Sequence, residues 1–425
     1  MKVYLHTQPL KSEISDIAPD KSVSHRSAIF SLLSDKPSHI KNYLLADDTL
    51  STLEILKTLG AKVEQNKDEI SIVPPTKFNE PNRVLDCGNS GTTMRIFTGL
   101  LSSKDGFFVL SGDKYLNERP MKRVCEPLRS IGAKIDGRAG GDKAPLSIRG
   151  GNLDYFEYES KIASAQVKTA LILAALNSKG CKYSEPELSR DHSERILKGM
   201  GAEISNDGLN LVVSALKKPL EPLEIYVPND PSSGFFFAVG AMLIPGSKIV
   251  LKDMLINKTR VEAYNVLAKM GAKIEFIKKD SKYEDIGDIV VEYSKLKGVE
   301  VTQNISWLID EAPALAVAFS VAEGKSVIRN ASELRVKECD RISVTVEALK
   351  ACGVNAKELD DGFEIVGGNT LNPAIIDSHG DHRIAMSFAI LGLKCGMIIE
   401  GSECINVSFP NFANVLKRLG VSVED

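Results

Sequence analysis

The stretch Leu56-Lys57-Thr58-Leu59-Gly60-Ala61-Lys62-Val63 decides the fold of this chain, because versions of it recur six times. In each version an amphipathic run ends in a glycine, and a short strand-like run follows directly. The glycines are 67 to 82 positions apart, at Gly60, Gly132, Gly201, Gly271, Gly353 and Gly420. This period exceeds that of common solenoid units. It predicts six copies of a small α/β module, with each glycine just past a helix end at positive φ.

A second helix is predicted upstream of each glycine-ended one. It is more uniformly apolar, as in buried helices, and it begins with polar residues, at 21–22, 89–92, 164–166, 230–233, 310–311 and 381–383. Alternating runs predict strands at Glu69–Val73, Phe107–Leu110, Leu209–Val213, Ile289–Tyr293 and Phe363–Val366. Each module is therefore expected to be a sheet packed on one buried and one exposed helix.

Composition narrows the class of protein. A chain of 425 residues with 43% hydrophobic and 26% charged residues is typical of a soluble globular protein of two or three domains. The net charge of −3 gives no support for nucleic acid as a partner. Seven scattered cysteines without a Cys-x-x-Cys pair argue against a disulfide framework or a zinc site. With neither a secretion signal nor a membrane span in the sequence, a cytoplasmic protein is expected.

The best domain boundary is the proline-rich segment 227–231, with three modules on each side. Residues 7–20 precede the first module, so the N-terminal strand is expected to join the C-terminal half. We predict one globular domain from residues 1–19 plus 230–425 and a second from residues 20–229. A hinge and an active-site cleft are expected between them.

Basic residues near the buried helices point to anionic ligands. Helix starts offer free N–H groups and a positive dipole end, although polar residues there also act as simple caps. Capping does not explain the nearby cations, which are costly beside apolar helices unless they meet an anion; they are Lys21, Arg26, Arg95 and Arg383. Arginines are also predicted at the starts of four glycine-ended helices, where they oppose the dipole; they are Arg119, Arg190, Arg260 and Arg341. The pattern favours phosphate or carboxylate binding over scattered surface charge.

Two acidic segments are candidates for acid–base chemistry. Asp310-Glu311 opens an apolar helix, and Lys337–Arg341 is a dense charged cluster, for which a solvated helix start is the alternative. His379, Asp381 and His382 resemble a metal site superficially but lack a further ligand cluster, so no metal is expected. The chain also lacks the glycine patterns of nucleotide-binding loops.

Five motifs, in this order, carry a family resemblance: Asp20–Arg26, Gly88–Arg95, Glu118–Met121, Arg335–Arg341 and Gly380–Met386. Together they closely resemble the motifs of the 5-enolpyruvylshikimate-3-phosphate synthase family, whose members catalyse the sixth step of the shikimate pathway. Ala163–Lys168 and Ser189–His192 are similar to its class II bacterial branch.

The resemblance implies an inside-out α/β barrel of the enolpyruvyl transferase type, with two domains of three βαβαββ units each. It implies transfer of the enolpyruvyl group of phosphoenolpyruvate to the 5-hydroxyl of shikimate 3-phosphate, in chorismate and aromatic amino acid biosynthesis. It implies no metal or organic cofactor and no nucleic-acid or membrane partner. A monomer acting on two small molecules is expected.

The resemblance also implies residue roles. Shikimate 3-phosphate would be held by Lys21, Ser22, Arg26, Ser164, Ala165, Gln166, Arg190, Asp310 and Lys337. Phosphoenolpyruvate would be held by Lys21, Gly91, Arg119, Gln166, Arg341 and Arg383. Asp310 would take the proton of the attacking hydroxyl, and Glu338, with Lys21 as its cationic partner, would transfer protons at the methylene carbon.

Two departures from the family pattern and two alternatives remain, one departure being Ile96 where many members carry a proline. Val407 stands where many members carry a phosphoenolpyruvate-binding lysine, while Gly91 is retained, which predicts sensitivity to glyphosate. The first alternative is the transferase acting on UDP-N-acetylglucosamine, which places a reactive cysteine on a loop; here Cys125 is predicted inside a helix. The second is a non-catalytic repeat scaffold that binds an anion, which leaves Asp310 and Glu338 unexplained.

Overall fold

The computed structural model describes residues 1–424, which divide into two compact units. The N-terminal unit is Pro19–Val227 together with the short segment Lys282–Glu284. The C-terminal unit is Met1–Ala18, Pro228–Ser281 and the described chain from Asp285 onward. Among the described residues, no helix is long and apolar enough to cross a bilayer.

The N-terminal unit contains three four-stranded sheets. In each, the first two strands are parallel and the remaining neighbours antiparallel. The strand orders are β14 (Glu224–Tyr226), β3 (Ser38–Lys41), β5 (Glu69–Val73), β4 (Lys62–Asn66); β6 (Leu85–Asp86), β7 (Gly106–Ser111), β9 (Lys143–Gly150), β8 (Lys134–Gly137); and β10 (Phe156–Glu159), β11 (Cys181–Ser184), β13 (Asn210–Val213), β12 (Ile204–Asp207). Two sheets follow the chain as βαβαββ, and the late strand β14 completes the third.

The C-terminal unit also contains three four-stranded sheets. Their orders are β16 (Lys273–Lys279), β17 (Ile286–Glu292), β15 (Lys248–Leu255), β2 (Lys11–Ile14); β18 (Glu300–Val301), β19 (Lys325–Ile328), β21 (Gly362–Val366), β20 (Asn355–Leu359); and β22 (Ala374–Asp377), β23 (Met397–Glu400), β1 (Lys2–Val3), β24 (Val423–Glu424). The N-terminal strand β2 pairs in parallel with β15, and β1 pairs with β23 and β24. The start of the chain therefore completes two sheets built by its second half.

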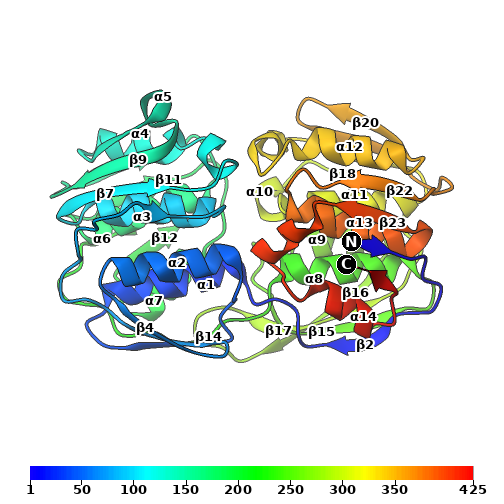
Figure 1. Cartoon of the computed structure of the whole chain (residues 1–425), viewed down its shortest axis with the longest axis horizontal. Coiled ribbons are helices and arrows are strands. Elements are labelled where there is room, and N and C mark those ends of the chain that lie inside the picture. The colour runs from blue at the N-terminus through cyan, green and yellow to red at the C-terminus, as the bar shows by residue number, and fades with distance from the viewer. Residues whose placement is uncertain (425) are drawn as a thin grey trace. The chain divides into compact units, whose positions relative to one another are not determined.

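Buried helices form the core of each unit, and the sheets lie around them (Figure 1). These helices are α1 (Lys21–Phe30), α3 (Gly91–Ser102) and α6 (Ala165–Leu176) in the N-terminal unit, and α8 (Pro231–Leu243), α11 (Ala312–Val321) and α13 (His382–Cys395) in the other. Polar side chains cap five of the six by accepting a backbone N–H bond: Asp20, Ser90, Ser164, Asp230 and Asp381. The polar residues at these helix starts therefore do act as caps, and basic residues lie near the same helix starts.

The glycine-ended helices are α2 (Asp47–Thr58), α4 (Lys122–Ser130), α7 (His192–Gly199), α9 (Glu262–Lys269), α12 (Arg341–Ala351) and α14 (Phe412–Arg418). All six glycines lie just past the helix end, with φ from 83° to 108°. At each, the residue after the glycine donates its N–H to a carbonyl five positions back, as Ala61 does to Leu56. This is the Schellman pattern, and it confirms the prediction from the repeat.

The five predicted strands are confirmed, with ends displaced by at most three residues. The arginine prediction is wrong in three of four modules, because Arg119, Arg190 and Arg260 lie in loops just before their helices. Arg119 precedes Pro120, which disfavours a helical conformation, and it is extended at φ −74° and ψ 148°. Arg341 alone begins a helix. The short helical segments are η1 (Ser31–Leu33), η2 (Leu116–Glu118), α5 (Arg138–Gly141), α10 (Ile305–Leu308), η3 (Ser332–Val336) and η4 (Ser402–Val407).

Candidate active site

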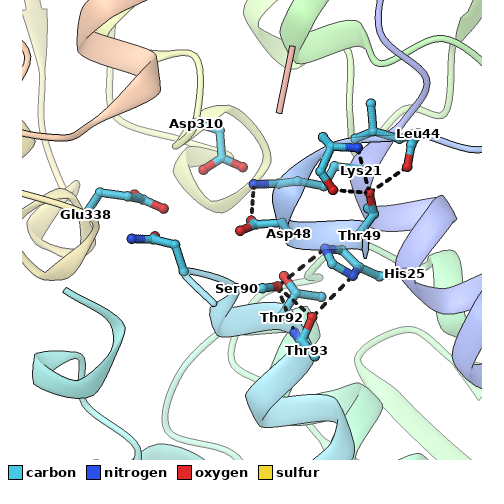
Figure 2. Close-up of polar contacts among 12 residues, drawn as sticks. Lys21, His25, Leu44, Asp48, Thr49, Ser90, Thr92, Thr93, Asp310 and Glu338 are labelled. Atoms are coloured by element: carbon cyan, nitrogen blue, oxygen red, sulfur yellow. Dashed lines mark hydrogen bonds and ion pairs between the residues drawn. The ribbon is translucent and has the colours of Figure 1, made fainter. Parts of the chain in front are cut away.

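In the N-terminal unit, Lys21 is the first residue of α1, and it forms an ion pair with Asp48 in the first turn of α2. Figure 2 shows this pair, with Lys21 Nζ 3.0 Å from Asp48 Oδ2. The lysine side chain keeps 17% of its surface exposed, whereas the carboxylate keeps 7%. Asp48 therefore orients the ammonium group but leaves part of it accessible.

One turn further along α1, His25 is fully buried among hydroxyl groups (Figure 2). Its Nδ1 lies 2.7 Å from Thr52 Oγ1, and its Nε2 lies 3.4 Å from Ser90 Oγ. Thr93 joins this cluster through Thr52 and Ser90, at 2.8 and 2.7 Å. Burial, and then the charges of Lys21 and of the arginine next to it, hold the pKa of His25 well below its ordinary value. A neutral imidazole thus links α1, α2 and the cap of α3.

Two guanidinium groups border Gly91, the first residue of α3. A Cβ atom built on Gly91 would lie 3.0 Å from Arg95 Nη1 and 3.4 Å from Arg119 Nη1. Arg119 donates a very short hydrogen bond to Asn89, which in turn donates to Asp113 at 2.6 Å. Both arginines are buried, at 8% exposure. Two cations beside a helix N-terminus form a strong local positive field, suited to an anion.

Gln166 connects the start of α6 to the start of α3. Its Oε1 accepts a bond from Arg95 Nη1 at 2.5 Å, and its Nε2 donates to Thr92 Oγ1 at 3.0 Å. Ser164 caps α6, and Ala165 is the first residue of that helix. The predicted residues of these two helix starts are therefore held together by side-chain bonds.

Arg26 lies deeper than a simple ligand contact would require. Only 2% of it is exposed, and it donates to Ser193 Oγ at 2.8 Å, Thr169 Oγ1 at 3.1 Å and the Ser22 carbonyl at 3.1 Å. Burial lowers its pKa to about 10, so it remains charged at neutral pH. Arg190, in the loop before α7, is half-buried and lowers the pKa of Arg26 by charge repulsion.

In the C-terminal unit, Arg341 gathers three carboxylates. Its guanidinium lies 2.7 Å from Asp381 Oδ2, 2.6 Å from Glu338 Oε2 and 3.5 Å from Asp310 Oδ1, with 1% of the residue exposed. Burial alone would lower the pKa of Arg341, but these three carboxylates outweigh it and raise the pKa. The two predicted acid–base residues, Asp310 and Glu338, therefore share one guanidinium group.

Two further cations belong to this cluster. Lys337 Nζ lies 4.0 Å from Asp310 Oδ1, and its pKa is lowered, chiefly by burial and then by the charge of Arg341. Arg383, in the first turn of α13, is 5% exposed, and its Nε and Nη1 have no hydrogen-bond partner within residues 1–424. A buried guanidinium that lacks internal acceptors is suited to an external anion. Val407 ends η4, the segment packed on α13.

The structure differs from the sequence-based predictions at one arginine, and it shows side-chain contacts that were not predicted. Arg260, expected to bind an anion, instead forms a 2.9 Å ion pair with Asp230 and a 3.0 Å bond to Ser232. Nothing in the sequence singles out Asp48, because its place in the first turn of α2 depends on where that helix begins. The sequence marks Arg95 as a basic residue near a helix start, but no local pattern signals its contact with Gln166, 71 positions away.

The structure gives no support for a metal site or for a reactive cysteine among the described residues. Within the described chain, no group of three His, Cys, Asp or Glu side chains is arranged to hold a metal ion. Cys125 lies inside α4, as predicted, and burial raises the pKa of its thiol to about 12. Such a thiol is a poor nucleophile, in contrast to the reactive loop cysteine of the UDP-N-acetylglucosamine alternative.

Known sequences are similar to this chain along its length. A family model described as EPSP synthase (3-phosphoshikimate 1-carboxyvinyltransferase) matches residues 5–416. A 3-phosphoshikimate 1-carboxyvinyltransferase of Campylobacter hominis is 65% identical over 425 residues, covering all of both chains. One from a Nitratiruptor species is 62% identical, covering 97% of this chain and 96% of the relative.

Known structures are similar as well. EPSP synthase from Acinetobacter baumannii superposes with a TM-score of 0.87 at 36% identity, covering 100% of this chain and 99% of that one. The enolpyruvyl transferase NikO from Streptomyces tendae superposes with a TM-score of 0.81 at 17% identity, covering 100% and 98%. The second likeness concerns the fold alone. Together they confirm the predicted fold class, the α/β architecture of the enolpyruvyl transferases.

Proposed function

This chain belongs to the EPSP synthase family and has that family's reaction, and we propose that the two clusters described above perform it. The reaction moves the enolpyruvyl group of phosphoenolpyruvate onto the 5-hydroxyl of shikimate 3-phosphate and releases phosphate, within the shikimate pathway. Membership decides against a non-catalytic scaffold and against UDP-N-acetylglucosamine as the acceptor. The finer assignment concerns which residues bind and which transfer protons.

Phosphoenolpyruvate binding is assigned to cations from both units. It carries a phosphate and a carboxylate, so it needs several donors with fixed geometry. The buried pair of guanidinium groups at Gly91 supports one part of this assignment. A second part is supported by Arg383, whose Nε and Nη1 have no hydrogen-bond partner in the described chain. The proposed set also includes Arg341, Lys21 and Gln166.

Shikimate 3-phosphate is assigned to the start of α1, the start of α6 and the loop before α7, with two residues of the C-terminal unit. The full set is Lys21, Ser22, Arg26, Ser164, Ala165, Gln166, Arg190, Asp310 and Lys337. Helix N-termini with basic neighbours favour its phosphate group. Because Arg26 already donates hydrogen bonds to Ser193 and Thr169, we assign it to positioning the site more than to direct contact with the substrate.

The single observation that carries the mechanism is the sharing of Arg341 by Asp310 and Glu338. In the addition step, Asp310 takes the proton of the 5-hydroxyl while the hydroxyl oxygen bonds to C2 of phosphoenolpyruvate. Glu338 delivers a proton to the methylene carbon, which becomes a methyl group. In the elimination step, Glu338 takes a proton back from that methyl carbon, the C–H electron pair forms the carbon–carbon double bond, and the bond from C2 to the phosphate oxygen breaks with its electrons going to phosphate.

Charge stabilisation follows from the same residues. Positive charge develops at C2 during both steps, and fixed carboxylates lower the energy of such a centre. The lysine at position 21 is assigned as the cationic partner of Glu338, with its ammonium group oriented by Asp48. Excluding water protects the reactive centre from hydrolysis.

Glu338→Gln tests the assignment of proton transfer. The amide keeps the shape of the side chain but cannot donate a proton to carbon, so turnover is expected to be abolished. Binding of shikimate 3-phosphate, measured by isothermal titration calorimetry, should remain close to that of wild type. Lost binding would mean that the residue is structural.

Arg190→Ala is the matched comparison, because its assigned role is binding and not proton transfer. Loss of a charge-assisted bond is expected to weaken shikimate 3-phosphate binding by about 1.5–3 kcal/mol. A dissociation constant equal to that of wild type would place Arg190 outside the site.

A further inference from the structure

Lys168, in the first turns of α6, is a buried cation with no assigned role in the reaction. Its ammonium group lies 2.8 Å from Glu185 Oε1 and 2.8 Å from Glu194 Oε1. The lysine side chain is 2% exposed, and both carboxylates are 3% exposed. The two glutamates flank Arg190 in the chain, one on the loop before it and one on α7 after it.

Glu185 also fixes the residue that immediately precedes Arg190. Its Oε1 accepts the backbone N–H of Ser189 at 3.0 Å, and its Oε2 accepts the Ser189 hydroxyl at 2.6 Å. The Ser189 carbonyl accepts a longer bond from Lys168 Nζ, at 3.4 Å. Every polar group of Ser189 is therefore held by the Lys168–Glu185 pair.

The same lysine is joined to the predicted ligand residues of α6. Its backbone N–H donates to the carbonyl of Ser164 at 2.9 Å, within the helix turn that includes Ala165 and Gln166. Lys168 thus connects the start of α6, the loop that carries Arg190, and the first turn of α7.

Fold stability alone does not account for this arrangement. Taking an ammonium and two carboxylates out of water is expensive, and well-packed apolar residues of similar size are often as stable. Burial would lower the pKa of Lys168, but Glu194 and Glu185 outweigh it and raise the pKa. Burial also raises the pKa of Glu194, against the influence of Lys168. Such a cluster is a rigid support whose geometry is specified by directional bonds.

We propose that Lys168 is a positioning residue for shikimate 3-phosphate, holding Arg190 and the start of α6 in one fixed arrangement through Glu185 and Glu194. This inference rests on the binding roles proposed above for Arg190 and for the start of α6. Small displacements of binding groups are costly when the bonds are directional. Loss of the Lys168 charge should therefore weaken the binding of shikimate 3-phosphate more than that of phosphoenolpyruvate.

Lys168→Met tests the proposal, since it keeps the length of the side chain and removes the charge. The dissociation constant of shikimate 3-phosphate, measured by calorimetry, is expected to rise about tenfold, the equivalent of ~1.4 kcal/mol. The KM for shikimate 3-phosphate should rise in parallel, while the KM for phosphoenolpyruvate, to which only Gln166 of these positioned residues is assigned, should rise less. A purely structural role would lower the melting temperature and the active fraction but leave both KM values unchanged, and that result would overturn the proposal.

Two variants accompany this measurement. Ser189→Ala removes one hydroxyl bond to Glu185 and is expected to weaken binding about threefold to tenfold; it decides the matter if Lys168→Met does not fold, and unchanged binding in it contradicts the proposal. Lys179→Met is the control, because that exposed lysine forms a 2.5 Å ion pair with Asp154 in the same unit. It should match wild type. Failure of wild type to bind shikimate 3-phosphate would instead overturn the proposed function, and this inference with it.

Discussion

At the scale of single residues, Gly91 matters because it leaves room beside two guanidinium groups. A methyl group there would stand 3.0 Å from Arg95 and 3.4 Å from Arg119, at the flexible ends of both side chains. The fold can therefore accept Gly91→Ala, but the guanidinium groups must move. We expect the KM for phosphoenolpyruvate to rise several-fold, with the KM for shikimate 3-phosphate unchanged, in steady-state kinetics.

The same substitution bears on inhibition. The retained glycine predicts sensitivity to glyphosate, and the added methyl group is expected to raise the inhibition constant by crowding the inhibitor. Inhibition measured on both forms checks this, and equal inhibition constants would contradict the assigned role of Gly91.

His25 gives a prediction about pH. The folded protein holds it neutral, whereas the unfolded chain takes up a proton below its ordinary pKa of 6.5. Stability linked to His25 is therefore full above pH 6.5 and is lost as the pH falls below it, by up to ~1.4 kcal/mol per pH unit. In urea unfolding from about pH 7 to about pH 5, His25→Asn should show a flatter decline than wild type. Equal slopes would mean that His25 is protonated in the folded state.

At the scale of elements, the helix-ending glycines are the clearest test of the repeat. Gly201 has φ +95°, and a Cβ built there meets nothing within 4 Å, so only backbone strain opposes a side chain. Gly201→Ala is expected to lower the free energy of unfolding by about 1–2 kcal/mol without changing KM. Gly151, which also has open space but no positive φ, is the matched control.

Urea denaturation of both alanine variants decides between strain and simple loss of glycine. Gly151→Ala should stay within about 0.5 kcal/mol of wild type. If the two variants lose equal stability, the positive φ of Gly201 is not what makes glycine necessary there.

Element types and caps could be predicted because their signals are local. The glycine, the apolar face and the polar cap all lie within a few turns of one another, so the C′ glycines and the cap at Ser90 could be read directly from the sequence. The exact helix starts could not, since Arg119, Arg190 and Arg260 depend on loop conformation. Their spacing to the glycine is regular even though they are not helical.

At the scale of the whole molecule, long-range pairing was the least predictable feature. Strand β14 completes a sheet begun almost two hundred residues earlier, and residues 282–284 group with the N-terminal unit although their neighbours do not. Within that unit, Glu284 binds buried His192 at 2.7 Å. No local pattern signals such a contact, because the partners are 92 positions apart.

The candidate site was predictable to the extent that its residues stand at equivalent places in the repeat. Lys21, Gly91 and Gln166 lie at successive helix starts, and the family motifs supply their roles. What the sequence could not supply is which cations already have internal partners. Arg260 is neutralised by Asp230, whereas Arg383 keeps two donor nitrogens without an acceptor in the described chain.

The most direct test of the central claim is phosphate release from phosphoenolpyruvate by the whole chain, with either shikimate 3-phosphate or UDP-N-acetylglucosamine as acceptor. The account predicts release with shikimate 3-phosphate, matched one for one by the enolpyruvyl product, and none with the nucleotide sugar. Absence of release with shikimate 3-phosphate, or release only with UDP-N-acetylglucosamine, would contradict it.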